Sequence, residues 1–197
     1  MKNKFLFIAV FVLFLSAFIS ESSYAQAFKL KPGSKLVYEV NFPSEKYDFI
    51  IVLNVFSDSI FFNFSMTNAN RTAGTAVIQA LPLQNSFKMY NYFHSDNMIF
   101  INETAIWISK DAYNAFANNG KAEMESVNDY KKLLNVDDKI SAYNAKINGE
   151  DKTLEIFYAD GNDAKEPFKL WVLKDPTNPL IVKMDLGWTV HLKEIIE

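Results

Sequence analysis

Hydrophobic and polar residues alternate with a period of two over most of the chain beyond residue 33. In residues 35–42 (KLVYEVNF) the even-numbered positions are Leu, Tyr, Val and Phe, whereas the odd-numbered ones are mostly polar. Successive side chains of a β-strand point to opposite faces of the sheet. This segment therefore predicts a half-buried strand.

The next two segments predict a hairpin. Residues 47–56 (YDFIIVLNVF) alternate at their ends but are apolar on both faces in the middle, and residues 59–66 (SIFFNFSM) alternate throughout. Only Ser57 and Asp58 separate them, and two such runs joined by a two-residue polar link are typical of a β-hairpin.

The same alternation predicts eight further strands. They cover residues 75–81, 86–93, 97–102, 104–109, 139–147, 152–159, 167–174 and 179–195. The last of these is long, and Gly187 interrupts it, which indicates a bend or a bulge.

Two segments break the strand pattern. Residues 110–119 (KDAYNAFANN) favour a helix: Ser109 is a good N-cap, Asp111 suits the positive end of the helix dipole, and Gly120 can adopt the left-handed conformation that ends helices. A second short helix is expected over residues 128–135 (NDYKKLLN).

Short strands joined by short turns, with no regular alternation of strand and helix, indicate a mainly β fold. We expect a single domain over residues 26–197, built as a curled antiparallel sheet or a (half-)barrel of about 9–11 strands with one or two short helices.

Residues 1–25 predict an N-terminal signal helix. Lys2 and Lys4 precede an apolar run over residues 5–19, and small and polar residues follow, so that cleavage fits after Ala25 or Ala27. The alternative is an uncleaved anchor, but this apolar run reaches only about 22 Å as a helix, less than the ~30 Å hydrocarbon core. We expect no stable membrane span after cleavage.

Composition limits the class of binding partner and the cellular compartment. The chain has 20 Lys plus Arg against 23 Asp plus Glu, a net charge of −3, and no cysteine. Nucleic-acid binding needs a clustered surplus of basic residues, and this chain has no surplus. The composition therefore argues against nucleic acid as a partner. An exported domain without disulfides indicates the bacterial periplasm or the cell exterior.

Residues that support common catalytic or cofactor chemistry are scarce. His94 and His191 are the two histidines, too few for a zinc site without cysteine, and both fall at polar positions that predict solvent-facing side chains. The six glycines are too widely spaced for a phosphate-binding loop. Residues 160–166 (DGNDAKE) resemble a calcium loop in composition but lack its ligand spacing, and predict a turn.

We therefore expect no enzymatic activity, metal or cofactor. A hydrolase with an unrecognised site stays open as an alternative, because the members of a catalytic triad need not be close in sequence.

Aromatic residues make up 15% of the chain and lie mainly on the predicted strands. They fit either a dry, tightly packed core or a curled sheet that encloses a cavity for an acyl chain or another hydrophobic ligand. The candidates for lining such a cavity are Phe62, Phe64, Trp107, Trp171 and Trp188.

Residues 168–195 carry a resemblance to a known group. The strand FKLWVLKD, the turn over residues 176–179, the strand PLIVKM and the amphipathic GWTVHLKEI follow one another there. This order resembles the closing hairpin of uncharacterised exported bacterial β-rich proteins. These are similar in architecture to periplasmic lipoprotein carriers of the Lol type, in which a curved antiparallel sheet around a helix holds acyl chains. The resemblance implies a curved sheet and a carrier function and supplies no catalytic residue. The lipid anchor of the Lol-type receptor has no counterpart, because the chain lacks cysteine.

Together these patterns predict a secreted, non-enzymatic domain that binds a lipid or another hydrophobic small molecule. The alternative is a structural or interaction protein of the cell envelope with a dry core, whose partner is another envelope protein.

Overall fold

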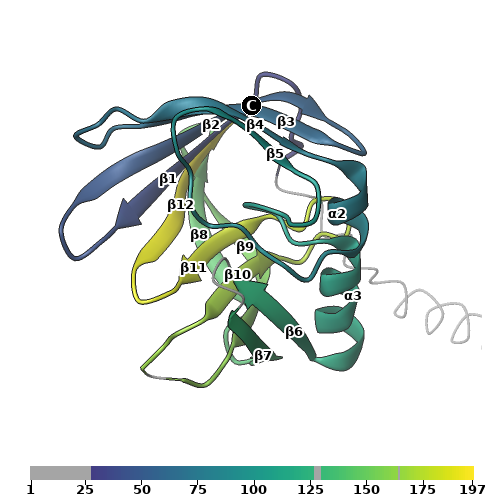
Figure 1. Ribbon diagram of the computed structural model, residues 1–197. Coiled ribbons are helices and arrows are strands. Elements are labelled where there is room, and N and C mark those ends of the chain that lie inside the picture. The colour runs from purple at the N-terminus through teal and green to yellow at the C-terminus, as the bar shows by residue number, and fades with distance from the viewer. Residues whose placement is uncertain (1–27, 127–129, 164) are drawn as a thin grey trace, which may run out of the picture.

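The computed structural model describes residues 28–126, 130–163 and 165–197, and in these residues twelve strands and two helices form one curled sheet with a helical side (Figure 1). The predicted signal segment lies outside the described residues. The strands are β1 (Lys35–Asn41), β2 (Lys46–Phe56), β3 (Ile60–Met66), β4 (Ala73–Ile78), β5 (Asn97–Phe100), β6 (Lys121–Ser126), β7 (Tyr130–Val136), β8 (Ala142–Ile147), β9 (Glu150–Asp160), β10 (Lys169–Leu173), β11 (Ile181–Asp185) and β12 (Thr189–Ile196), and the helices are α2 (Ala80–Asn85) and α3 (Lys110–Asn119).

Five strands close into a ring. β8 pairs with β9 on one side and with β12 on the other, and β9, β10, β11 and β12 pair in succession. The sheet continues from β12 through β1, β2, β3 and β4 to β5, and from β9 through β7 to β6. The prediction of a mainly β fold with a curled or closed sheet is therefore confirmed. The pairings β4–β5 and β8–β12 are parallel, and the other strand pairs are antiparallel.

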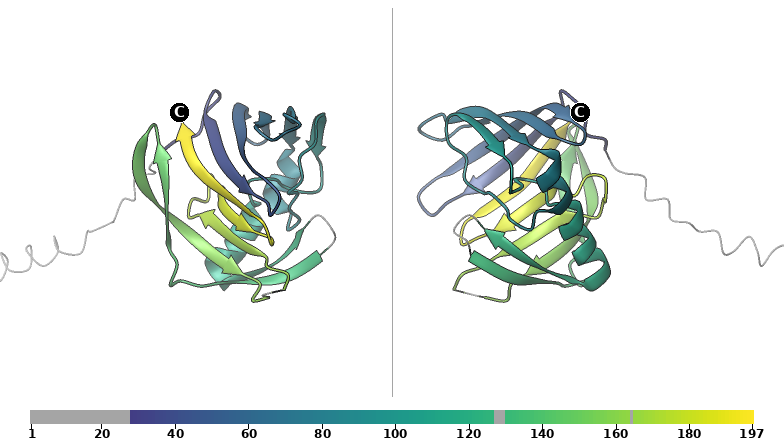
Figure 2. Two further views of the ribbon diagram at one scale, coloured as in Figure 1. Left: turned by 90° about the vertical axis from the view of Figure 1, so that its left-hand side faces the viewer. Right: turned by 45° about the vertical axis from the view of Figure 1, so that its right-hand side comes forward.

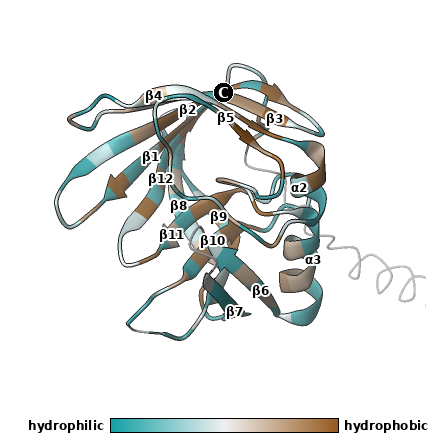
Figure 3. Cartoon of the chain, viewed as in Figure 1, coloured by the Kyte–Doolittle hydropathy of each residue, from teal (hydrophilic) through white to brown (hydrophobic). Residues whose placement is uncertain are grey.

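Period-two alternation decides which side chains point into the sheet. In β1 each even-numbered residue is buried and each odd-numbered one is partly exposed. Figure 3 shows the same banding of hydrophobic and hydrophilic positions along the strands, with mostly hydrophilic turns between them. The concave side therefore carries the apolar core, including the fully buried Leu36, Tyr38 and Phe62.

Residues 104–109 lie inside the curled sheet and do not form the expected strand. All six are buried, and they hydrogen-bond at the start of β11: Ile108 N–H donates to the Pro179 carbonyl (3.1 Å) and Ile181 N–H to the Ile106 carbonyl (2.8 Å). Ile106 has φ = 66°, which breaks an extended conformation. Residues 104–109 are mostly apolar because they are buried on every side, and not because they form a strand with one buried face.

Residues 86–93 also fail to form the expected strand. Only Lys88 and Met89 make isolated bridges, to Glu125 of β6 and to Thr104. The segment has extended stretches but no continuous partner, because it passes between β6 and the buried residues 104–109.

The helix expected over residues 128–135 is wrong. Its described part belongs to β7, which pairs with β6, a strand that the sequence pattern did not reveal. Leu134 is buried whereas Leu133 is 48% exposed. These adjacent leucines point to opposite sides of the strand.

The long last strand is in fact two. Gly187 has φ = 84°, Leu186 N–H donates to the Trp188 carbonyl (3.0 Å), and Asp185 pairs with Thr189 across the turn. The predicted bend is thus a tight reversal between β11 and β12.

Helix α3 forms where the sequence predicted it. Ser109 Oγ accepts a hydrogen bond from Ala112 N–H (3.0 Å), and Gly120 ends the helix with φ = 65°. The helix packs against β6 and the short α2, on the right-hand side of Figure 1 and in front in the right-hand view of Figure 2. α2 was not expected; it takes residues 80 and 81 from the predicted strand 75–81 and accommodates Pro82 in its first turn. Within the described ranges, no helix has the length and apolar character needed to cross a bilayer.

Candidate ligand-binding site

Two adjoining hollows lie at one end of the curled sheet, where the turns β1–β2 and β11–β12 meet the loop that follows Tyr90. The small hollow has a volume of about 300 Å³ and the large one about 810 Å³. Phe42, Asn91, Tyr92 and Trp188 line both of them. We call these four residues the mouth.

The rings of Phe42 and Trp188 stack at the mouth. Their centroids are 4.3 Å apart and their planes differ by 20°, and Tyr47 continues the stack beyond Phe42 at 6.3 Å. Phe42 directly follows β1 and Trp188 directly precedes β12. Because Asn41 pairs with Thr189 in the antiparallel register, the residues just beyond this pair meet across the two strands.

The floor of the small hollow is apolar and comes from neighbouring strands. Val40, Val190 and Met184 are cross-strand neighbours on β1, β12 and β11, and all three are buried. Phe93 and Ile106, also buried, line the hollow from the two segments that cross the inside of the sheet.

The rim of the small hollow is polar and more exposed. Besides Asn91 and Tyr92, it carries the side chains of Ser44, Glu45, Asn68, Asn70 and Thr72 from the turns β1–β2 and β3–β4. Tyr92 is 64% exposed. Burial, followed by the nearby Glu45 carboxylate and Tyr92, raises the pKa of Tyr47, so its hydroxyl stays protonated and able to donate.

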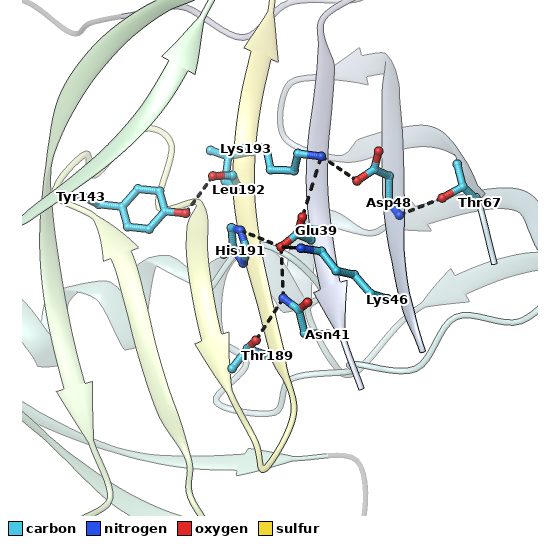
Figure 4. A network of polar contacts seen from close by, with 10 residues as sticks. All are labelled: Glu39, Asn41, Lys46, Asp48, Thr67, Tyr143, Thr189, His191, Leu192 and Lys193. Atoms are coloured by element: carbon cyan, nitrogen blue, oxygen red, sulfur yellow. Dashed lines mark hydrogen bonds and ion pairs between the residues drawn. The ribbon is translucent and has the colours of Figure 1, made fainter. Parts of the chain in front are cut away.

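A network of polar contacts covers the opposite, convex face of the same strands (Figure 4). Glu39 of β1 is at its centre: Lys46 Nζ lies 2.8 Å and His191 Nε2 3.4 Å from its Oε1. Lys193 reaches both Glu39 (3.9 Å) and Asp48 (2.9 Å). The network therefore ties β1, β2 and β12 together directly behind the mouth.

The network also shifts the protonation of its members. The hydrogen bond from Lys46 is the main cause that lowers the pKa of Glu39. Burial lowers the pKa of His191, although the Glu39 carboxylate opposes this shift. Burial and, secondly, Glu39 raise the pKa of Tyr143 to about 12; its hydroxyl donates to the Leu192 carbonyl (2.7 Å).

The two histidines differ in environment. The His191 side chain is 32% exposed and sits against Glu39, so it is half-buried rather than freely solvent-facing. His94 lies in a loop with its Nδ1 3.8 Å from Asp96. Two hydroxyl groups drawn with His191 in Figure 4 are engaged elsewhere: Thr189 Oγ1 accepts from Asn41 Nδ2, and the Tyr143 hydroxyl donates to the Leu192 carbonyl. The arrangement thus stabilises the pairing of strands.

The structure separates the five predicted ligand-lining residues. Trp188 lies at the mouth. Phe62, Phe64 and Trp107 lie in the buried core. The Phe93 ring packs against both phenylalanine rings, and the ring centroids of Trp107 and Phe62 are 6.1 Å apart. Trp171 is elsewhere: its ring packs on Tyr158 at 4.7 Å, and Lys183 Nζ lies 4.4 Å above it.

Trp107 also borders a different hollow at the other end of the sheet. This hollow has a volume of about 710 Å³ and is open towards α2, with Leu81, Leu83 and Pro179 in its wall. Trp107 Nε1 donates to Asn178 Oδ1 (2.9 Å), and the buried Asn178 Nδ2 has no partner among the described residues.

In the segment 160–166, of which residue 164 lies outside the described part, a hydrogen bond and ion pairs hold Asp160 and Asp163. Asp160 accepts from the Tyr158 hydroxyl and faces Lys169, and Asp163 pairs with Lys132 at 2.8 Å. The described part of the chain brings no three His, Cys, Asp or Glu side chains together in a metal-binding arrangement.

Sequence reasoning missed Phe42, Tyr47, Asn91 and Tyr92. The available signal was parity: Phe42 continues the inward face of β1 into the turn, as Trp188 does ahead of β12. Parity gives no such signal for Asn91 and Tyr92, because the segment that carries them does not form a strand.

Comparison of the chain with protein-family models, with curated proteins and with solved structures gives no match.

Proposed function

We propose that this chain is a non-enzymatic, exported binding domain whose mouth takes a hydrophobic or lipid-like ligand. The observation that carries the proposal is the stacked Phe42–Trp188 pair, with the exposed Tyr92 beside it, lining both hollows. Small-molecule sites in proteins are mostly hollows of about 300–1,000 Å³ lined by apolar and aromatic side chains with a few polar groups.

The rest of the fold directs a ligand to the mouth rather than to the centre of the sheet. Residues 104–109 occupy the interior and are buried, so a deep cavity of the carrier type is filled by the chain itself. An apolar ligand would instead lie on the row Val40, Val190 and Met184 and would cover aromatic surface that is otherwise exposed to water.

The filled interior also favours a second candidate, a structural or interaction protein of the cell envelope. In that case the mouth would be a contact surface for another envelope protein. Either candidate depends on export, which rests on the predicted signal segment and stays a prediction; cell fractionation and the mass of the exported chain test it.

Bromine quenching of tryptophan fluorescence tests ligand binding at the mouth. The chain has three tryptophans, and a bromine atom quenches only an indole that it contacts. We expect 11-bromoundecanol to quench the Trp188 emission, since its chain end would reach the floor beside that ring. The Trp188→Phe variant should lose the ligand-dependent quenching.

Trp171→Phe is the matched control, because Trp171 packs on Tyr158 and Lys183 away from the mouth and this variant should retain the quenching. Equal quenching of the wild type and Trp188→Phe would exclude the mouth as the site. Mass spectrometry of an organic-solvent extract of the purified protein adds an independent check: co-purified lipid supports the proposal. A clean extract together with no quenching favours the interaction protein.

A further inference from the structure

Polar and apolar groups in the small hollow are separated by depth. The floor consists of buried aliphatic and aromatic side chains, whereas the rim consists of hydroxyls, amides and one carboxylate from exposed turns. A ligand that satisfied both would have an apolar part and a polar part at its two ends.

Several rim groups are available for hydrogen bonds. The amides of Asn70 and Asn91 and the hydroxyls of Ser44, Tyr47 and Tyr92 line the hollow and make no hydrogen bond with another described side chain or main-chain group. Asn68 differs, because its amide is engaged with Thr72 in the β3–β4 turn.

The charge of the rim argues against an anionic head group. Among the described residues that line the small hollow, Glu45 is the charged one. The neighbouring Lys46 points to the opposite face of the sheet, where it pairs with Glu39 at 2.8 Å. A carboxylate or phosphate at this rim would meet a like charge and no lysine or arginine of the lining.

From these three observations we infer that the ligand of the small hollow is a neutral amphiphile, with an alkyl chain on the Val40–Val190–Met184 floor and a hydroxyl-bearing head, a sugar or a glycerol, at the Asn70–Asn91–Tyr92 rim. This inference rests on the proposed function and specifies its ligand class. The amides and phenol hydroxyls of the rim both donate and accept, which matches the donor and acceptor pairs that hydroxyl groups present.

Titration with eight-carbon amphiphiles below their micelle concentrations tests the head-group preference. Octyl β-glucoside and monooctanoylglycerol are compared with octanoate, octyl sulfate and octyltrimethylammonium, with Trp188 fluorescence or calorimetry as the readout. We expect the two neutral compounds to bind at least tenfold more tightly than the charged ones, and glucose alone to bind far more weakly than octyl glucoside.

Tyr92→Phe and Asn91→Ala separate the head-group contacts from the apolar ones. Each removes hydrogen-bonding groups while leaving the floor intact. A lost hydrogen bond should weaken octyl glucoside binding about fivefold. 11-Bromoundecanol has a single hydroxyl and a longer alkyl chain, so its quenching should depend less on the rim. Asn118→Ala on the exposed side of α3 is the matched control and should change neither. Thermal melting of each variant checks that it is folded.

The outcomes distinguish failure of the head-group inference from failure of the proposed function. Equal affinity for octanoate and octyl glucoside, or no effect of either rim variant, overturns the head-group inference while the binding site stands. Failure of every amphiphile to bind overturns the proposed function as well. Tighter binding of octyltrimethylammonium than of octyl glucoside would show that Glu45 selects a cation, which also contradicts the inference.

Discussion

The rings of Phe42 and Trp188 stack face to face, with centroids 4.3 Å apart, between two hollows that both residues line. The pair joins the β1–β2 turn to the β11–β12 turn. Behind it, on the convex face, Asn41 Nδ2 donates to Thr189 Oγ1 (3.5 Å) and the Glu39 network links the same strands. The two strands that carry the mouth are thus linked on both sides, by the ring stack on one and by these polar contacts on the other.

A double-mutant cycle on this pair should reveal a favourable coupling. Phe42→Ala and Trp188→Ala each remove the stacking. The double variant should therefore lose less free energy of unfolding than the two single variants lose together, by about 0.5–1.5 kcal/mol. Urea unfolding of the four proteins measures it. Strict additivity would mean that the stack contributes only burial of each ring.

Gly74→Ala should be strongly destabilising, by about 1–3 kcal/mol or more. A Cβ at this position in β4 would overlap the Asp96 carbonyl oxygen and lie 2.8 Å from Phe64 Cζ. Ala73→Ser, at an exposed position on the same strand, is the control and should change stability little. A melting temperature of Gly74→Ala equal to that of the wild type would show that β5 and Phe64 can shift apart.

Ser109→Ala should cost about 1 kcal/mol in the free energy of unfolding. The buried Ser109 Oγ accepts from Ala112 N–H at 3.0 Å, and its loss leaves a donor at the start of α3 without a partner. Ser109→Thr retains the acceptor and should recover part of that stability in chemical denaturation. If both variants unfold at the same denaturant concentration as the wild type, the cap is not stabilising.

Tyr38→Phe should destabilise more than Tyr143→Phe. The Tyr38 hydroxyl is buried and donates to the Ile181 carbonyl at 2.9 Å, which links β1 to β11 through the core. Removing it should cost about 1–2 kcal/mol, whereas the Tyr143 hydroxyl is half-buried and water can replace it more readily. Chemical denaturation of the two variants gives the comparison, and the reverse order would contradict the prediction.

Stability should fall on mild acidification because of His191. Burial lowers its pKa in the folded state below the ordinary value of 6.5, so the unfolded chain binds the proton more readily. The free energy of unfolding therefore decreases as the pH falls through 6.5 and levels off below the folded-state pKa. Glu39, whose pKa is also lowered, adds its own loss only at lower pH, below its ordinary value of 4.5.

His191→Gln should flatten the dependence between pH 7.5 and 5.5, as measured by chemical denaturation at several pH values. His94→Gln provides the control at an exposed loop position. A wild-type profile that His191→Gln leaves unchanged in this range would refute the assignment to His191.

Much of the fold could be read from the sequence, since strand formation and side-chain parity are local. The inward positions of β1 and β3 follow from alternation alone, and both caps of α3 follow from the residues that flank the helix. The errors arose where tertiary contacts override the local pattern. Residues 128–135 suggested a helix, but their described part pairs with β6, and residues 104–109 suggested a strand but are buried inside the sheet.

The sequence by itself determined a mainly β chain with an apolar inner face, and it singled out Trp188 as one aromatic residue of interest. Only the tertiary structure decided that residues 104–109 fill the interior, and that Phe42 and Trp188, from opposite ends of the chain, meet at the mouth. The reason is physical: alternation fixes the side of a strand on which a residue lies. Which residues meet across that side depends on the pairing of distant strands, and a local pattern does not encode that pairing.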